Sequence, residues 1–458
     1  MSILNNDVLY LIFKEFRNDK KSLFSCLSVN KTWSEIIISI LWINPWKYLK
    51  RGNEKILSNV IISHISDKSS ERPLFNYISL CKHLNLNEIE RIFYTHIQFE
   101  KIKNDIFNLF INQNTKYTHL YIPRKFDYEI HLIPEAKNCF SEIEFLSCDA
   151  SIDENILIGL AEICKSIKEL ELFVQMDNYN YGITKLIENQ NKLFKIHFII
   201  KYTRNDNSFW KVFKSSLFKH TNTIKYFKLT EKSMERNFQK ICILELGGNF
   251  SNMTLNSVED LSIPFLRILK ARDAPVKFLT NLIESSNGYL VEINIYYINI
   301  LLTQKIDNNK IIQTIYQNCS NLKYLRLLFK SSNILELEKL LINCKYLDGL
   351  YIDTNLGTMD WKNLFNILTE SSPISLFKFK FHFSYELPNL EYIKLFFDNW
   401  KGRHPMLLQF LQTGRMIKEY NDLIEKYKSE GVVKKFHYEE YSGDYFDEFE
   451  WIKVKKNY

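Results

Sequence analysis

Histidine and cysteine are the side chains best suited to acid–base, nucleophilic or metal chemistry, and this 458-residue chain holds ten histidines and eight cysteines. No two histidines have the His-x-x-x-His spacing that would place both imidazoles on one helical face for zinc. No Cys-x-x-Cys pair occurs either, and the wide cysteine spacing suits neither a zinc cluster nor a disulfide framework. We therefore expect buried, reduced thiols and no metal site.

Motifs that bind phosphate or activate a nucleophile are also missing from the sequence. Neither Gly-x-x-x-x-Gly-Lys-Ser/Thr nor Gly-x-Gly-x-x-Gly is present, and there is no Gly-x-Ser-x-Gly. The chain is accordingly expected to be neither an enzyme nor a cofactor-binding protein.

The composition indicates a large folded protein. Hydrophobic residues make up 46% of the chain and aromatic residues 15%, which excludes general disorder. With only 12 glycines and 9 prolines, long regular elements are favoured over a turn-rich sandwich or barrel. The net charge of +7 is spread along the chain without a basic block, so nucleic-acid binding is not expected. The start lacks a signal-peptide pattern and no apolar run approaches the ~20 residues that span a bilayer, so we expect a cytosolic or nuclear protein without membrane attachment.

A six-residue pattern, apolar-x-x-apolar-x-apolar, recurs along the chain. Three clear copies have their apolar anchors at Leu322/Leu325/Leu327, Leu347/Leu350/Ile352 and Leu376/Phe379/Phe381. Successive copies from residue 143 begin 17 to 32 residues apart, most of them near the ~20–29 of leucine-rich repeats. Each copy follows a run with helical periodicity, and this alternation predicts parallel strands joined by helices and stacked as a solenoid.

Three cysteines occupy one position of this repeat. Cys164, Cys319 and Cys344 each precede the first anchor of a copy by three residues. This phase places the thiol at the end of the repeat helix, where it is expected to pack in the core.

The first 46 residues carry a different pattern. Apolar residues over 4–16 lie on one helical face, with Asn5 or Asn6 placed to cap the helix. A second short helix with Ser22 as its N-cap and a third over 30–41 are predicted next. Three such helices enclose a small core, which usually depends on neighbouring elements or on a partner for its stability.

This segment resembles the F-box, the adaptor-docking module of SCF-type ubiquitin ligase receptors. The family pattern runs Leu-Pro-x-Glu-Ile-Leu-x-x-Ile-Phe, then Leu-x-x-Val-x-Lys-x-Trp; its matches here are Leu4, Asp7, Val8, Leu9, Ile12, Phe13, Val29, Lys31 and Trp33. The proline position holds Asn5. The resemblance implies that a Skp-type adaptor, and through it a cullin, is bound by Leu4, Asn5, Val8, Leu9, Ile12, Phe13, Leu27, Val29 and Trp33. An ordinary helical hairpin that caps the repeats is the alternative.

We therefore predict an α/β chain in which an F-box-like three-helix bundle precedes an irregular leucine-rich-repeat solenoid. The expected domains are the bundle at 1–46, a helical linker and N-terminal cap at 47–115, the solenoid at 116–387, and a C-terminal cap and tail at 388–458. The cysteine phase of the repeats is similar to that of the leucine-rich repeats often found downstream of F-boxes.

The predicted function is that of a substrate-recognition subunit of an SCF-type E3 ubiquitin ligase, whose repeats bind an unknown target protein. Candidate target-binding residues are the outward strand positions Lys323, Tyr324, Arg326, Asp348 and Tyr351, since aromatic and arginine side chains are common interface anchors; a plain solvated strand face is equally open. Two alternatives are a ubiquitin-independent interaction scaffold and an effector or receptor that binds a small ligand in the solenoid.

Overall fold

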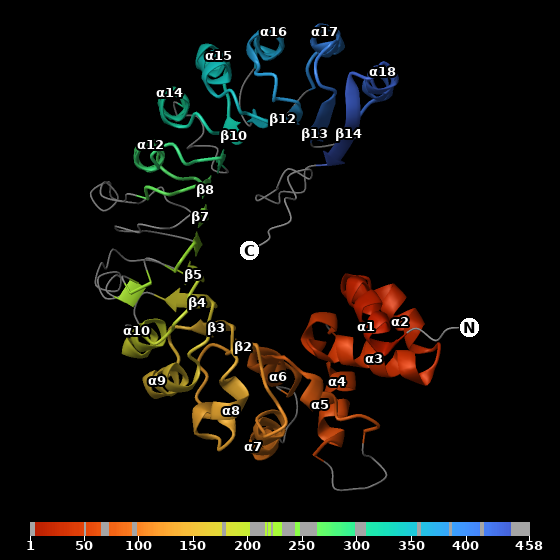
Figure 1. Cartoon of the computed structure of the whole chain (residues 1–458), viewed down its shortest axis with the longest axis vertical. Coiled ribbons are helices and arrows are strands. Elements are labelled where there is room, and N and C mark those ends of the chain that lie inside the picture. The colour runs from red at the N-terminus through yellow and green to blue at the C-terminus, as the bar shows by residue number, and fades with distance from the viewer. Residues whose placement is uncertain are drawn as a thin grey trace. The chain divides into compact units, whose positions relative to one another are not determined.

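A computed structural model (Figure 1) describes the chain in two compact units, residues Met1–Thr223 and Ile224–Tyr458, which are treated separately below. The described residues are 5–49, 52–65, 73–93, 99–175, 180–201, 216–217, 219–220, 223–230, 243–247, 263–297, 308–354, 359–383, 387–412 and 416–440. Leu4, the polar stretch at 66–72 and the tail from residue 441 therefore lie outside the described residues.

The first unit begins with the three predicted helices, α1 (Asn6–Glu15), α2 (Lys20–Leu27) and α3 (Lys31–Trp42). Asn5 caps α1 by accepting a hydrogen bond from the backbone N–H of Asp7. The prediction that Ser22 caps α2 is wrong. Asp19 is the N-cap, because the 3-10 turn at Phe16–Asn18 brings its carboxylate to the backbone N–H of Ser22 and also to its hydroxyl.

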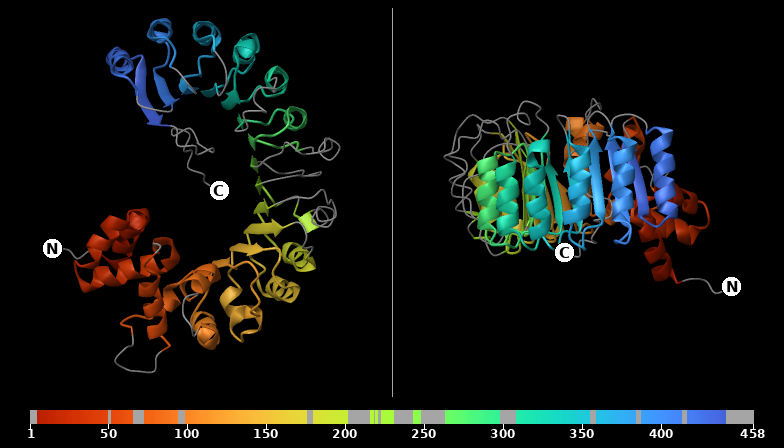
Figure 2. Two further views of the ribbon diagram at one scale, coloured as in Figure 1. Left: turned by 180° about the vertical axis from the view of Figure 1, so that it is seen from behind. Right: turned by 90° about the horizontal axis from the view of Figure 1, so that it is seen from above.

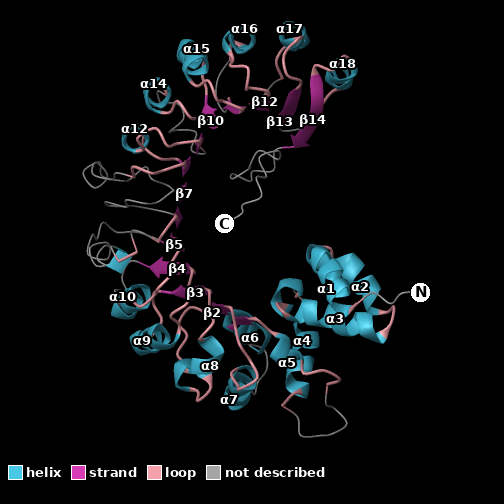
Figure 3. Ribbon diagram, viewed as in Figure 1, coloured by secondary structure: helices cyan, strands magenta, loops and turns pink. Residues whose placement is uncertain are grey.

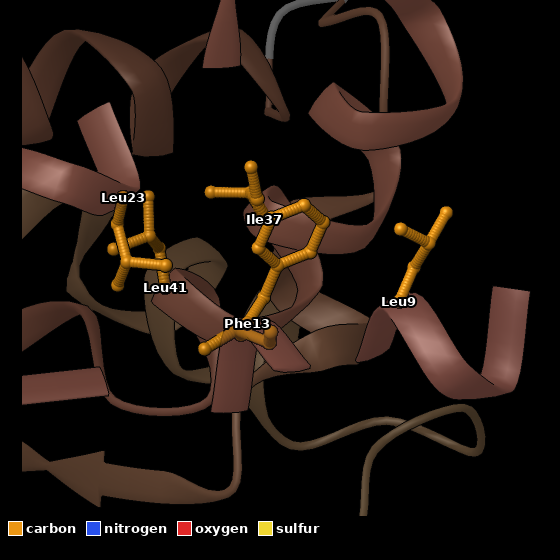
Figure 4. Close-up of a cluster of buried hydrophobic side chains, with 6 residues drawn as sticks. Leu9, Phe13, Leu23, Ile37 and Leu41 are labelled. Carbon is orange, nitrogen blue, oxygen red and sulfur yellow. The ribbon is translucent and has the colours of Figure 1, made fainter. Parts of the chain in front are cut away.

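These helices enclose a small apolar core, part of which Figure 4 shows. Its buried members are Leu9, Phe13, Leu23, Ile37, Ile40 and Leu41. Trp33 is only partly buried and packs edge-on against the ring of Phe13, with 4.9 Å between ring centroids. The core thus depends on one side of each helix, and α1 contributes two residues one helical turn apart.

The rest of the first unit builds a parallel sheet with a helix between successive strands. Its elements are α4 (Glu54–Ser63), α5 (Tyr77–Leu80), β1 (His83–Asn85), α6 (Leu86–Phe93), α7 (Phe99–Phe110), β2 (His119–Tyr121), α8 (Ala136–Phe140), β3 (Phe145–Asp149), α9 (Glu154–Ile163), β4 (Glu169–Gln175), α10 (Tyr181–Glu188) and β5 (Lys195–Lys201). Strands β1 to β5 pair in chain order. The sheet starts with β1, in the segment predicted as linker and cap. This strand was not predicted, because it has a single buried residue, Leu84, and leads straight into α6 without a repeat signature.

In the second unit, helices and strands alternate from β8 onward among the described residues. The elements of this unit are β6 (Tyr226–Thr230), β7 (Ile243–Gly247), β8 (Ile268–Arg272), α12 (Val276–Ser285), β9 (Glu292–Tyr296), α14 (Asn309–Asn318), β10 (Tyr324–Leu328), α15 (Ile334–Asn343), β11 (Gly349–Asp353), α16 (Trp361–Ser371), β12 (Lys378–Phe383), α17 (Leu390–Trp400), β13 (Met406–Gln412), α18 (Lys418–Ser429) and β14 (Val433–Glu440). Strands β6 to β14 are parallel and pair in chain order. Within each unit the helices that connect successive strands line one side of the sheet (Figures 2 and 3). The segment predicted as C-terminal cap adds two more helix–strand units, and β14 was not predicted.

The apolar anchors align between strands. Leu325, Leu350, Phe379 and Leu408 are register partners on β10 to β13, and each is fully buried. Cys164, Cys319 and Cys344 are the C-caps of α9, α14 and α15 and are also buried. The predicted packing of anchors and thiols is therefore confirmed, and the chain is a parallel-strand solenoid with leucine-rich repeat signatures.

An anchor and an exposed leucine of the same repeat allow a direct test of this core. Leu350→Ala should lower the free energy of unfolding by about 2–5 kcal/mol, because Leu350 is 0% exposed and its loss leaves a cavity. Leu335→Ala on α15, 68% exposed, should change it by less than about 0.5 kcal/mol. Urea denaturation of both full-length variants, followed by circular dichroism, measures the difference; equal effects would contradict the packing described here.

Candidate functional site

The N-terminal bundle leaves an apolar surface open to solvent. We call it the bundle surface; its residues are 40–61% exposed and are Val8, Leu11, Ile12, Phe16, Phe24 and Val29. Helix α1 is thus apolar on two sides, since Leu9 and Phe13 fill the core while Val8 and Ile12 point outward. Packing against the core needs only one apolar side of a helix, so the second apolar side of α1 is a surface feature that the bundle core does not explain.

The predicted adaptor-binding residues divide between this surface and the core. Val8, Ile12 and Val29 are exposed, and so is the capping residue Asn5. Leu9 and Phe13 are buried, so their prediction as contact residues is corrected: they support the bundle surface from inside. Leu27 and Trp33 are partly buried, and Leu4 lies outside the described residues.

Sequence reasoning missed Leu11, Phe16 and Phe24 as surface residues. Leu11, 61% exposed, lies off the helical stripe that includes Leu9 and Phe13. The second apolar side of α1 is the signal that could have identified Leu11, because packing against a core requires only one apolar side of a helix.

The bundle region is joined to the sheet of the first unit through hydrogen bonds to His83. The indole Nε1–H of Trp46 donates to the His83 carbonyl at 2.7 Å, and the Nδ2 of Asn44 lies 3.2 Å from the His83 Nδ1. The His83 ring stacks on that of His119, 3.8 Å away. Burial, and then the neighbouring His119, lowers the pKa of His83 to about 4, so its ring is neutral at neutral pH. The segment that follows α3 therefore contacts the first strand directly.

In the second unit, the residue between the last two anchors of each strand faces away from the core. We call these residues the middle row; in register order they are Lys228, Glu245, Lys270, Asn294, Arg326, Tyr351, Lys380, Gln409 and His437. The row has four permanent cations and one carboxylate. Glu245 lies between two of the cations, 3.4 Å from the Nζ of Lys228 and 3.6 Å from that of Lys270.

Arg326 is the centre of a buried polar cluster in this row. Its guanidinium carbon lies 4.6 Å from the Tyr296 ring centroid and 4.2 Å from that of Tyr351. Its Nη2 is 3.5 Å from the Oδ2 of Asp353, and the Oδ1 of Asp353 is 3.0 Å from the Nδ1 of His382. Burial acts to raise the pKa of Asp353, but the hydrogen bond from His382 and the charges of His382 and Arg326 outweigh it, so this pKa is lowered. The prediction that Arg326 and Tyr351 face solvent is wrong, since they are only 4% and 1% exposed. Their burial follows from this stacking of rings and guanidinium.

The other predicted target-binding residues lie at the starts of strands β10 and β11. Lys323 is exposed, and Asp348 is partly buried. The hydroxyl of Tyr324 donates to the Oδ2 of Asp348 at 2.8 Å, and the Nζ of Lys378 lies 2.6 Å from the same oxygen. Gly349 makes room for this cluster, because a Cβ there would come within 2.9 Å of the Tyr324 ring.

One group of side chains in the first unit has the residue types of a hydrolytic site. Ser147 and His197 both bond to Glu171: the Ser147 hydroxyl donates to its Oε1 at 2.9 Å, and the His197 Nδ1 lies 3.0 Å from its Oε2. A serine nucleophile needs its proton directed to the imidazole, whereas here the proton points to the carboxylate.

Among the residues with assigned placement, no group of three or more His, Cys, Asp or Glu could hold a metal, and no helix is long and apolar enough to cross a membrane.

Comparison with known proteins gives a likeness in structure and none in sequence. No protein-family model matches the chain, and no curated protein sequence matches it. Among solved structures, the chain is similar to the leucine-rich repeat-containing protein LegL7 from Legionella pneumophila, at 14% sequence identity and a TM-score of 0.30, over 74% of this chain and 88% of that chain. The repeat architecture rests on the anchors and strand register described above.

The Arg326 cluster predicts a pH-dependent contribution to stability. Asp353→Asn should lower the free energy of unfolding at neutral pH by about 3–5 kcal/mol, because it leaves a buried guanidinium without its carboxylate. The folded-state pKa of Asp353 is lowered, so this contribution is complete above its unfolded pKa of about 3.9 and disappears as pH falls through the folded pKa. Urea denaturation of wild type and variant between pH 7 and 3 should show the two curves converging in acid.

The matched control is an exposed ion pair of the same unit. Glu425→Gln removes a carboxylate that is 67% exposed and lies 2.6 Å from the Nζ of Lys428. Its effect should stay below about 1 kcal/mol. A similarly small effect of Asp353→Asn at neutral pH would contradict the assigned role of Asp353.

Proposed function

We propose that the chain is a substrate-recognition subunit of an SCF-type E3 ubiquitin ligase. The bundle surface binds a Skp-type adaptor and through it a cullin, and the repeats bind a target protein. The observation that carries the proposal is that α1 is apolar on two sides, with Leu9 and Phe13 in the core and Val8 and Ile12 at the surface.

The chemistry of the bundle surface supports a protein partner. Its six exposed apolar residues come from α1, the turn after it, α2 and the turn before α3. A surface of this kind is stabilised when a partner removes it from water, at about 25 cal/mol per Å² of apolar area. The order and spacing of the F-box-like residues in the same helices support a Skp-type adaptor as this partner.

The backbone at Asn5 bears on the one departure from the F-box pattern. Asn5 has φ −60° and ψ 144°, and proline is restricted to φ near −65°. Asparagine here takes the backbone conformation of proline and adds a side-chain cap for α1. The substitution is therefore compatible with a proline-type entry into the helix.

In this role the protein makes and breaks no covalent bond. It increases the effective concentration of a target lysine near the ligase's charged ubiquitin carrier. Neither a cofactor nor a metal takes part, and the protein acts in the cytoplasm or nucleus. Target binding would fall to exposed residues at strand starts such as Lys323, together with the half-buried Tyr324 and Asp348.

The second candidate is a ubiquitin-independent interaction scaffold built on the repeats. The extended parallel sheet favours it, because stacked repeats offer broad binding surfaces whatever the N-terminal bundle does. The two candidates differ in whether the bundle surface binds the adaptor.

Co-expression with the host's Skp-type adaptor, followed by size-exclusion chromatography, distinguishes them. The wild-type chain should co-elute with the adaptor in a 1:1 complex. The double variant Val8→Asp, Ile12→Asp should lose the complex, because two carboxylates would be buried against an apolar partner. Both residues are 41% exposed, so the bundle should still fold, which circular dichroism would verify.

The matched control carries the same change on a helix of the second unit. Leu335 and Ile342 of α15 are 68% and 55% exposed, and Leu335→Asp, Ile342→Asp should leave co-elution unchanged. Separate elution of the wild-type chain and adaptor would favour the scaffold. Co-elution of a folded Val8→Asp, Ile12→Asp variant would exclude the bundle surface as the adaptor site.

A further inference from the structure

The edge of the second unit at which strands β8 to β11 begin carries exposed aromatic rings. Phe265, Tyr289 and Tyr346 are 44%, 51% and 61% exposed, and each directly precedes a buried leucine anchor. The ring centroids of Phe265 and Tyr289 lie 5.5 Å apart. Exposed rings gathered along one edge are typical of a surface that binds a partner, because aromatic side chains are common anchors of interfaces.

Three cations lie along the same edge. Arg267, Lys323 and Lys345 are exposed, and none of the three forms an ion pair with another described residue. The carboxylate of Asp348, which also lies here, is already bound by two side chains of neighbouring strands. Among the acids of residues 263–297 and 308–354, Glu284 at the end of α12 is the exposed one. The edge therefore has an excess of positive charge that these residues do not neutralise.

Backbone hydrogen bonds fix the order of the residues that begin these strands. The N–H of Val291 donates to the Arg267 carbonyl at 2.8 Å, and the N–H of Lys323 donates to the Val291 carbonyl at 2.9 Å. The N–H of Asp348 follows, at 2.8 Å from the Lys323 carbonyl. Arg267 and Lys323 are thus two strands apart, about 9.6 Å at ~4.8 Å per strand. The exposed tyrosines recur at the same interval, on the repeats of β9 and β11.

An extended peptide has a period that matches this interval. A polyproline II segment has three residues per turn and rises about 3.1 Å per residue, so every third side chain lies on one side at intervals of about 9.3 Å. Acids at every third position of such a segment can face Arg267 and Lys323 in turn. Rings at the positions between them can pack against Tyr289 and Tyr346.

The distribution of charge along the edge favours a protein over a nucleic acid as the occupant. A single-stranded nucleic acid carries a phosphate on every nucleotide and is typically held by a continuous positive groove. Here Val291 separates the cations Arg267 and Lys323, and the carboxylate of Asp348 follows them. An acidic protein segment, whose charges are separated by uncharged residues, fits this alternation.

We propose that the edge formed by Phe265, Arg267, Tyr289, Lys323, Lys345 and Tyr346 binds an extended acidic segment of a partner protein. The segment has acids at about every third position and aromatic or large apolar residues between them. This inference names the class of target for the repeats, and it rests on the proposed function only in that the repeats bind a target. Because it is tested without the adaptor, its failure and the failure of adaptor binding are distinguishable.

Fluorescence anisotropy with the full-length chain and a labelled peptide of four Asp-Tyr-Pro repeats tests the proposal. We expect saturable binding, weakened about tenfold or more when Asn replaces every Asp or Ser replaces every Tyr, because these changes remove the charges or the rings. A labelled oligothymidylate of the same number of units should bind less tightly than the peptide. The absence of saturable binding, equal binding of the Asn peptide, or tighter binding of the oligothymidylate would overturn the proposal.

Substitutions at the edge locate the binding. Lys323→Glu, Lys345→Glu should weaken binding of the Asp-Tyr-Pro peptide about tenfold or more, because the acids then face like charges. Tyr289→Ser, Tyr346→Ser should weaken it about tenfold, because two anchoring rings are lost. All four side chains are exposed, so both variants should fold, which circular dichroism would verify.

The control variant carries the same change of charge on the helices of this unit. Lys362 and Lys418 are exposed at the starts of α16 and α18, and Lys362→Glu, Lys418→Glu should leave the affinity of the peptide unchanged. An equal loss of affinity in this control would show attraction to net charge alone and would overturn the proposal. Unchanged affinity in the two folded edge variants would do the same.

Discussion

In-register stacking of parallel strands is the constraint on which the rest of this structure depends. Each repeat buries its anchors against the next, as Leu325, Leu350 and Phe379 do. The same register forces one residue per strand into a row on the opposite face, at a spacing of about 4.8 Å. Like charges directly opposite each other on neighbouring strands are destabilising. The middle row reflects this limit, since its four cations alternate with Glu245, Asn294 and Tyr351.

The Arg326 cluster shows how such a row keeps a charge away from water. The rings of Tyr296 and Tyr351 pack against the guanidinium, while Asp353 accepts a hydrogen bond from its Nη2. A buried ion pair often stabilises a fold no more than apolar residues of similar volume would. What it does provide is a fixed geometry, because each member leaves a costly unpaired charge when another is lost.

The sequence allowed the anchors, the repeat cysteines and the N-terminal helices to be predicted, because these signals are local. Leu350 and Cys344 could be identified from spacing within one repeat. Burial of Arg326 could not, because it depends on Tyr296 and Tyr351, which precede and follow it by 30 and 25 residues and come together only through strand register. Strand β1 escaped prediction for a different reason, since a three-residue strand that runs directly into a helix has no periodicity to read.

Only some residues of the bundle surface could be predicted from the sequence, for a related reason. The F-box resemblance identifies Val8 and Phe13 equally, because a sequence pattern gives the positions of residues and not the directions of their side chains. The helix decides between them: residues one turn apart share a side, so Leu9 and Phe13 enter the core while Val8 and Ile12 face outward. Leu11 widens this outward side beyond what core packing requires. The surplus of apolar residues on α1, more than the match to any motif, is the physical reason to expect a partner there.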